Sequence, residues 1–97
     1  MDGIYEIIIN TPMGKMQGKL YLSANGENID GTLEIMGMKN KLTGGKVKQN
    51  QCYFKGNFKN NALNLQYEIM GQLNGNILNI YAKTNMGEFK LQGNKIK

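Results

Sequence analysis

The chain has 97 residues, a length that fits one small domain and leaves no material for a second core. It contains no histidine, arginine or tryptophan and only one cysteine, so histidine-based acid–base catalysis, His/Cys metal sites and disulfides lack their residues. Twelve lysines against seven acidic residues give a net charge of +5, and 13 glycines with one proline are typical of a glycine-punctuated globular chain. We therefore expect a single non-enzymatic domain over residues 1–97, with no cofactor and no bound metal.

Turn signals recur along the chain at nearly equal intervals. One set is centred near residues 13, 37, 60 and 86, and a second set, which includes Asn25-Gly26 and Asn74-Gly75, is centred near 25, 50 and 74. Asn-Gly supplies the positive φ values of a two-residue hairpin turn. The spacing predicts eight strands, near residues 3–10, 14–23, 28–36, 39–48, 51–58, 62–72, 76–83 and 87–95. Within the fourth strand, Gly44-Gly45 predicts a bend or bulge.

Apolar and polar side chains alternate along most of these segments, which is typical of strands with one buried face. In the second segment, for example, Met16, Leu20 and Leu22 lie on one side and Lys15 and Lys19 on the other. No helical segment interrupts the pattern, so the apolar faces of the strands must cover one another. We therefore predict an all-β fold, an eight-stranded antiparallel up-and-down meander closed into a small barrel.

Several turn and core motifs follow one another in a recognisable order: Gly3-Ile4-Tyr5, Thr11 to Gly14, Leu20 to Leu22, Asn25-Gly26, Ile29 to Leu33, Leu42, Gly45 to Val47, Phe54 and Asn85 to Phe89. This order resembles small bacterial lipocalin-like (calycin-like) barrel domains, which occur alone or appended to larger metabolic enzymes. The resemblance covers nearly the whole chain and implies a calycin-like barrel, and it lends no catalytic residue. Tyr5 stands where related domains often have a tryptophan.

The predicted interior is a candidate site, because an eight-stranded barrel either fills with side chains or holds one small ligand. Four glycines on inward positions would either leave a pocket or let the strands coil sharply: Gly18, Gly31, Gly56 and Gly93. Polar groups would enter this space from Tyr5, Tyr67, Tyr81, Asn40 and Asn79. Their hydrogen-bond partners would be the backbone, water or the polar edge of a ligand.

Five of the seven methionines map near one end of the barrel, because alternate turns of a meander lie together: Met13, Met16, Met36, Met38 and Met86. They would plug the core at this Met-rich end or form a hydrophobic mouth or contact surface, and a thioether metal site is the least favoured interpretation. We predict a ligand site in the lumen or at the Met-rich end, formed by Tyr5, Met16, Gly18, Gly31, Met36, Met38, Phe54, Gly56, Tyr67, Tyr81 and Met86.

Six lysines and no acid lie between Lys39 and Lys59 and place +6 on the fourth and fifth strands. Such a stripe could meet phosphate or nucleic acid, but it lacks arginine, and Tyr53 is its one outward aromatic. We interpret the stripe as a solvated face and do not expect nucleic acid as a partner. Cys52 is interpreted as a half-buried strand thiol, since no histidine is present to activate it as a nucleophile.

We predict a non-enzymatic barrel that binds a small, mostly apolar molecule. The alternative is a structural or interaction module with a solid core, which contacts another protein or a second copy in a homodimer. Its outward apolar candidates are Ile8, Tyr21, Tyr53, Leu78 and Ile80. The sequence has no apolar run of membrane-spanning length and no signal-peptide pattern, so we expect a cytoplasmic protein without a membrane partner.

Overall fold

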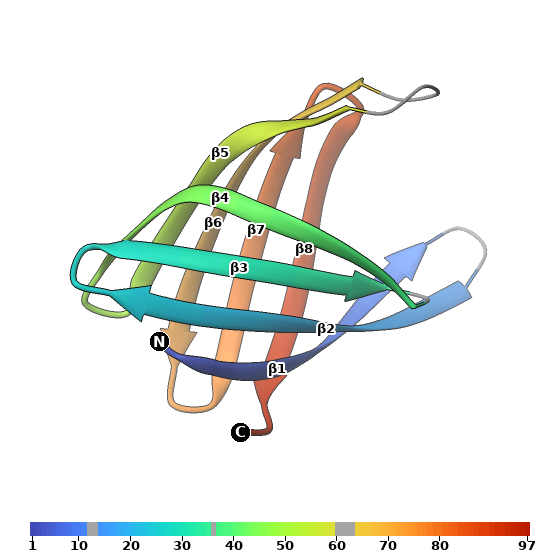
Figure 1. Cartoon of the computed structure of the whole chain (residues 1–97). Helices are drawn as coiled ribbons and strands as arrows, with labels where there is room; N and C mark the ends of the chain where they lie inside the picture. Colours follow the sequence, from blue (N-terminus) through green and yellow to red (C-terminus); the bar gives the residue numbers. More distant parts are fainter. Residues whose placement is uncertain (12–13, 36, 60–63) are drawn as a thin grey trace.

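Eight strands in chain order form the computed structural model (Figure 1), which describes residues 1–11, 14–35, 37–59 and 64–97. The strands are β1 (Gly3–Thr11), β2 (Gly14–Asn25), β3 (Asn28–Ile35), β4 (Met38–Lys48), β5 (Gln51–Lys59), β6 (Asn64–Asn74), β7 (Ile77–Thr84) and β8 (Gly87–Lys95). The described ranges contain no helix, and so none that could cross a membrane. The predicted all-β meander is confirmed.

Each strand pairs antiparallel with the next, and β1 pairs with β8, so the sheet closes into a barrel as predicted. Two seams are short. β4 and β5 pair only from Lys46–Tyr53 to Lys48–Gln51, and β1 and β8 pair from Tyr5 to Ile8 on β1. The barrel therefore consists of two four-stranded meanders, β1–β4 and β5–β8. Figure 1 shows β2 and β3 lying across the view and β5 to β8 standing at a steep angle to them.

Two-residue turns fix the register of most hairpins. Asn25 faces Asn28, Asn74 faces Ile77 and Thr84 faces Gly87, so two residues connect the strands in each case. The first residues of the Asn25–Asn28 and Asn74–Ile77 turns are glycines with φ values of 64° and 60°. These are the positive φ values that the Asn-Gly sequences predicted.

The predicted irregularity in β4 is confirmed as a β-bulge. Ile29 faces Gly45 whereas Gly31 faces Leu42, so β4 carries one extra residue opposite β3. Gly44 lies in the bulge with φ of 70°, a conformation that favours glycine. The extra residue shifts the alternation of β4, so both Leu42 and Gly45 are buried although their numbers differ by three.

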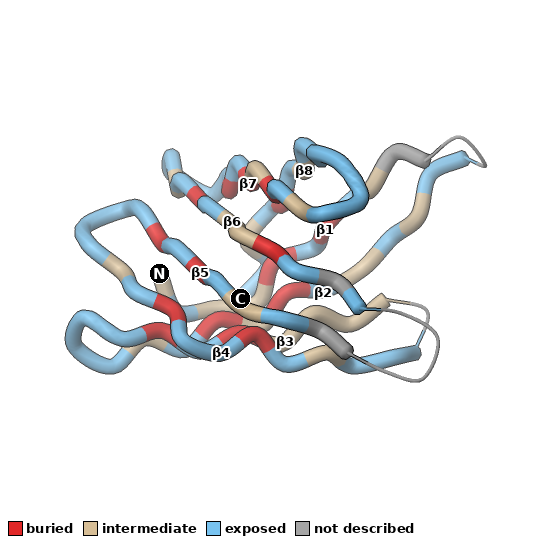
Figure 2. Tube along the Cα trace, turned by 90° about the horizontal axis from the view of Figure 1, so that it is seen from above, coloured by how far each residue is buried: buried red, intermediate tan, exposed pale blue. Residues whose placement is uncertain are grey.

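The interior is filled by side chains from both meanders. The largest of the fully buried side chains are Tyr5, Phe54, Ile7, Ile29 and Leu78. Viewed from above, buried and exposed stretches alternate along the strands, and the described hairpin turns are exposed (Figure 2). This alternation is what a barrel with one apolar and one polar face requires.

In β7 the inward and outward side chains are exchanged relative to our prediction. Leu78 is 0% exposed and Ile80 is 6% exposed, so the expectation that they face outward was wrong. Tyr81 and Asn79 lie on the outer face instead, and their expected inward positions were wrong too. The cause is the two-residue turn, which places Leu78 opposite Leu73 on the inward face of β6.

The tight packing at Gly45 leads to a stability prediction. A Cβ atom at Gly45 would overlap the Ile29 carbonyl oxygen and the Phe54 ring, whereas one at Gly93 would lie 3.5 Å from Ile7 Cγ1. We expect Gly45→Ala to destabilise the fold by about 3 kcal/mol and Gly93→Ala to change stability by less than about 1 kcal/mol. Urea unfolding followed by circular dichroism measures both, and equal effects would contradict the packing described here.

Candidate functional site

The space beside the inward glycine Gly31 is already occupied. A Cβ atom placed on Gly31 would lie 3.3 Å from Leu22 Cδ2 and 3.4 Å from both Leu42 Cδ1 and Phe54 Cζ. The glycine thus makes room for the Phe54 ring and its neighbours. The structure brings these two predicted site residues, Gly31 and Phe54, together as parts of the packed core.

Two further glycines of the predicted site are also in close contact. A Cβ atom on Gly56 would lie 2.9 Å from Tyr67 Oη, and one on Gly18 would lie 2.8 Å from the Glu34 carbonyl oxygen. Tyr67 is buried, and its ring lies across the position that Gly56 leaves free of a side chain. The interior glycines therefore accommodate neighbouring side chains and backbone.

The hydroxyl of the predicted site residue Tyr5 is used within the chain. Tyr5 is fully buried, and its Oη donates a hydrogen bond of 2.9 Å to the Met1 carbonyl oxygen. The backbone thus supplies the partner that a buried hydroxyl needs. Tyr5 serves the core at the end of the barrel that holds the N-terminus.

The Met-rich end, where β4 and β8 begin, is more exposed than the rest of the inward face. Met38 is 66% exposed and Met86 is 64% exposed, whereas Met16 is half-buried. Met13 and Met36 lie outside the described residues. The two exposed methionines do not plug the core, so they are available for contact.

The predicted lysine stripe is divided by the short seam between β4 and β5. Lys39 Nζ lies 3.9 Å from Glu34 Oε2, and Lys55 Nζ lies 4.0 Å from Glu68 Oε1. The segment Lys39 to Lys59 itself contains no acid, and the partners of these two exposed lysines come from the neighbouring strands β3 and β6. Lys46 and Lys48 lie in the paired part of the seam, where they line a groove on the outer face.

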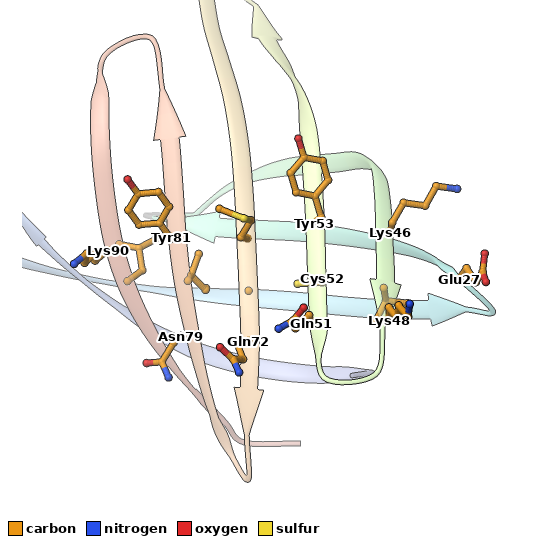
Figure 3. Close-up of a pocket in the computed structure, with 15 residues that line it drawn as sticks. Glu27, Lys46, Lys48, Gln51, Cys52, Tyr53, Gln72, Asn79, Tyr81 and Lys90 are labelled. Atoms are coloured by element: carbon orange, nitrogen blue, oxygen red, sulfur yellow. The ribbon is translucent and has the colours of Figure 1, made fainter.

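This groove of about 810 Å³ lies on the outer face of β4 to β8. One of its walls is a row of outward side chains that face each other directly across five strands: Lys46, Tyr53, Met70, Tyr81 and Lys90. The opposite wall is the parallel row two residues away along the strands: Lys48, Gln51, Gln72 and Asn79. Figure 3 shows the two rows, with the tyrosine rings on one side and the amides on the other.

The floor of the groove is backbone. It is formed where five residues with inward or absent side chains cross the sheet: Val47, Cys52, Gly71, Ile80 and Leu91. Five strands spaced about 4.8 Å apart give a length of about 19 Å, and two residues along a strand give a width of about 6.7 Å. The groove is thus long and narrow and runs across the strands.

Sequence reasoning missed this groove because it placed Tyr81 inside the barrel. Tyr53, as predicted, lies outward and exposed, and Met70 beside it is 48% exposed. With Tyr81 also outward, two tyrosines flank one methionine. The turn at Gly75 was the available signal, since a two-residue turn sets the phase of β7 from that of β6.

The groove is positively charged at both ends. Lys46 and Lys48 lie at the β4 end and Lys90 at the β8 end, and Glu27 is the one acid that lines the groove in the part of the chain that the structure describes. Among the described residues, Lys48 and Lys90 form no ion pair. Lys46 Nζ donates a 2.7 Å hydrogen bond to Asn28 Oδ1, which is neutral and leaves the lysine charge uncompensated.

Cys52 is the chain's one thiol, and it faces the interior beneath the groove. It is buried, and this burial raises the pKa of the thiol. The protonated thiol is a poor nucleophile.

A second hollow of about 340 Å³ lies outside β1 to β3, where the side chains of Glu6, Lys19 and Glu34 face one another across the strands with alternating charge.

No protein-family model matches this chain, and the curated proteins and the solved structures gave no match either. Within the described residues, no group of three or more His, Cys, Asp or Glu side chains could hold a metal ion. The groove is therefore interpreted from its own residues and their geometry.

Tyr81 offers a direct test of how the groove wall is arranged. A hydrogen bond to the Glu88 carboxylate raises the pKa of Tyr81, with smaller contributions from desolvation and from the Glu88 charge. We expect Glu88→Gln to lower the Tyr81 pKa toward its ordinary value, because the neutral amide no longer disfavours the phenolate. Glu68→Gln, on the same outer face, serves as control.

The measurement is an NMR titration of the protein with isotope-labelled tyrosine, in which Tyr81→Phe identifies the resonance. The arrangement described here requires a downward shift in the pKa with Glu88→Gln alone. An unchanged Tyr81 pKa would mean that its ring is not held against β8.

Proposed function

We propose that this protein is a non-enzymatic binding barrel whose ligand lies across the strands in the outer groove. The observation that carries the proposal is the pair of rows that line it, tyrosine and methionine on one side and amides on the other. The volume falls within the range of small-molecule sites, which combine apolar walls with a few placed polar groups. The ligand is elongated, with a flat apolar face and a polar edge.

The packed interior supports a site on the outside. Phe54 and Tyr67 occupy the spaces that Gly31 and Gly56 leave free, so a ligand in the middle of the lumen would have to displace core side chains. Loss of a buried aromatic from its site costs several kcal/mol. Binding in the outer groove leaves this packing unchanged.

The proposal of a non-enzymatic role rests on the residue types available. The chain lacks histidine, and the buried Cys52 thiol has a raised pKa. Among the described residues that line the groove, the only carboxylate is Glu27, and the other polar side chains are lysines, amides and tyrosines. We also propose that the barrel is lipocalin-like, since an eight-stranded up-and-down meander is the topology of that class.

The exposed side chains at the Met-rich end favour a second candidate, a small apolar ligand bound there. Phe89 and Met38 occupy inward positions, where they face Ala82 and Ile35 across the strands, yet both are exposed. Apolar side chains exposed on an inward face are typical of a contact surface. Binding at this end keeps the site that the sequence predicted at Met16, Met38 and Met86.

Three matched substitutions distinguish the two sites with anilinonaphthalene sulfonate, a fluorescent probe that is both aromatic and anionic. Met70→Glu places a charge in the centre of the groove, Met38→Glu places the same charge at the Met-rich end, and Ser23→Glu on the outer face of β2 is the control. We expect Met70→Glu to weaken binding by tenfold or more, because the charge repels the sulfonate and interrupts the apolar wall. The other two variants should bind like the unchanged protein.

If Met38→Glu alone loses binding, the probe binds at the Met-rich end and not in the groove. Equal binding by all three variants would contradict both sites. Light scattering on the same samples tests the remaining alternative, a homodimer. A dimer that Met70→Glu dissociates would mean that a second copy covers the groove and that the groove is an interface.

A further inference from the structure

We propose that the ligand of the groove is single-stranded nucleic acid, an inference that rests on the proposed function. The sequence favoured a solvated face because Tyr53 was the one outward aromatic beside the lysines. The structure adds Tyr81 to the same cross-strand row, with Met70 between them. The groove therefore combines aromatic faces with charge, the two features that a single-strand binding surface needs.

The spacing of the tyrosines suits two separate bases. Tyr53 on β5 and Tyr81 on β7 are two strands apart, which is about 10 Å. Their rings rise from the same face of the sheet (Figure 3). The exposed Met70 side chain lies between them in the cross-strand row. A base can stack on each tyrosine, and the flexible thioether can pack against the sugar or an intervening base.

The lysines are placed where a backbone would enter and leave the groove. Lys46 and Lys48 stand at one end and Lys90 at the other, which suits a chain of phosphates that follows the tyrosine row. The neighbouring outward row behaves differently, because Lys55, Glu68, Lys83 and Glu88 alternate in sign across β5 to β8. Three lysines outnumber the one carboxylate, Glu27, among the described groove-lining residues, whereas the charges of the neighbouring row cancel.

The amide wall faces the bases. Gln51, Gln72 and Asn79 each carry a donor and an acceptor, which match the hydrogen-bonding edges of unpaired bases. A neutral oligosaccharide would also fit tyrosines and amides, but it gives no role to lysines at both ends. A duplex hides its base faces from the tyrosines. The charge therefore favours a single strand over either of these ligands.

The test uses a fluorescent oligothymidylate of about ten nucleotides, a length within the range of about 4–16 nucleotides that single-strand binding OB-fold domains cover. Fluorescence anisotropy gives the affinity at several salt concentrations. Tyr53→Ala and Tyr81→Ala remove the stacking faces, and we expect each to weaken binding about fivefold or more. Tyr53→Phe keeps the ring and should bind like the unchanged protein. Tyr21→Ala, on the outer face of the other meander, is the matched control and should also have no effect.

Salt dependence tests the lysines separately. We expect Lys48→Gln and Lys90→Gln each to reduce the slope of log affinity against log salt by about 0.7, the value for one phosphate contact on a single strand. Binding that depends on the lysines but not on the tyrosines would overturn the inference, because it would be nonspecific attraction of a polyanion. Equal affinity for a duplex of the same sequence would overturn it as well.

Two other outcomes separate this inference from the proposed function. If cellohexaose binds in a tyrosine-dependent and salt-independent way and the oligothymidylate does not, the groove is a glycan site and the inference is wrong. If the oligothymidylate does not bind but anilinonaphthalene sulfonate still depends on Met70, the groove remains a ligand site and only its ligand class is wrong. If neither probe depends on groove residues, both proposals are wrong.

Discussion

The cross-strand register of β4 to β8 is the constraint on which both the interior and the groove depend. Two-residue turns after Lys48, Asn74 and Thr84 fix which residues of neighbouring strands face each other. Because successive side chains alternate between the two faces, the register that buries Leu78 also places Tyr81 outside. A slip of one residue in β7 would bury Tyr81 and break both walls of the groove. The packing of the core therefore also holds the groove side chains in their rows across the strands.

The filled interior and the outer groove have separate roles. A barrel of eight short strands has little interior space, and here Phe54 and Tyr67 occupy the room that Gly31 and Gly56 provide. The groove runs across the strands on the outer face of β4 to β8. Its floor is backbone that is already hydrogen-bonded within the sheet. A ligand can therefore bind without opening the barrel, so we expect the protein to change little in shape on binding.

Most of the fold could be predicted from local signals, whereas the groove could not. Alternation and the Asn25-Gly26 turn are properties of short stretches, and they placed the strands within two residues of those observed. The segment Ile77 to Ala82 carries large apolar or aromatic side chains on both faces, so alternation alone gave β7 the wrong phase. The groove depends on the alignment of five strands at once, including the shift that the bulge at Gly44 introduces into β4. The short seam between β4 and β5, which divides the lysine stripe, has no signature in the sequence at all.

The most direct measurement is an amide proton–nitrogen correlation spectrum of the protein titrated with the oligothymidylate. If the ligand lies in the outer groove, the largest shifts will map to the backbone amides of the groove floor, at Cys52, Gly71 and Ile80. The amides of Leu33 and Ile35, near the Met-rich end, will remain unchanged. Shifts concentrated at Leu33 and Ile35 would contradict the account and place the ligand at the Met-rich end.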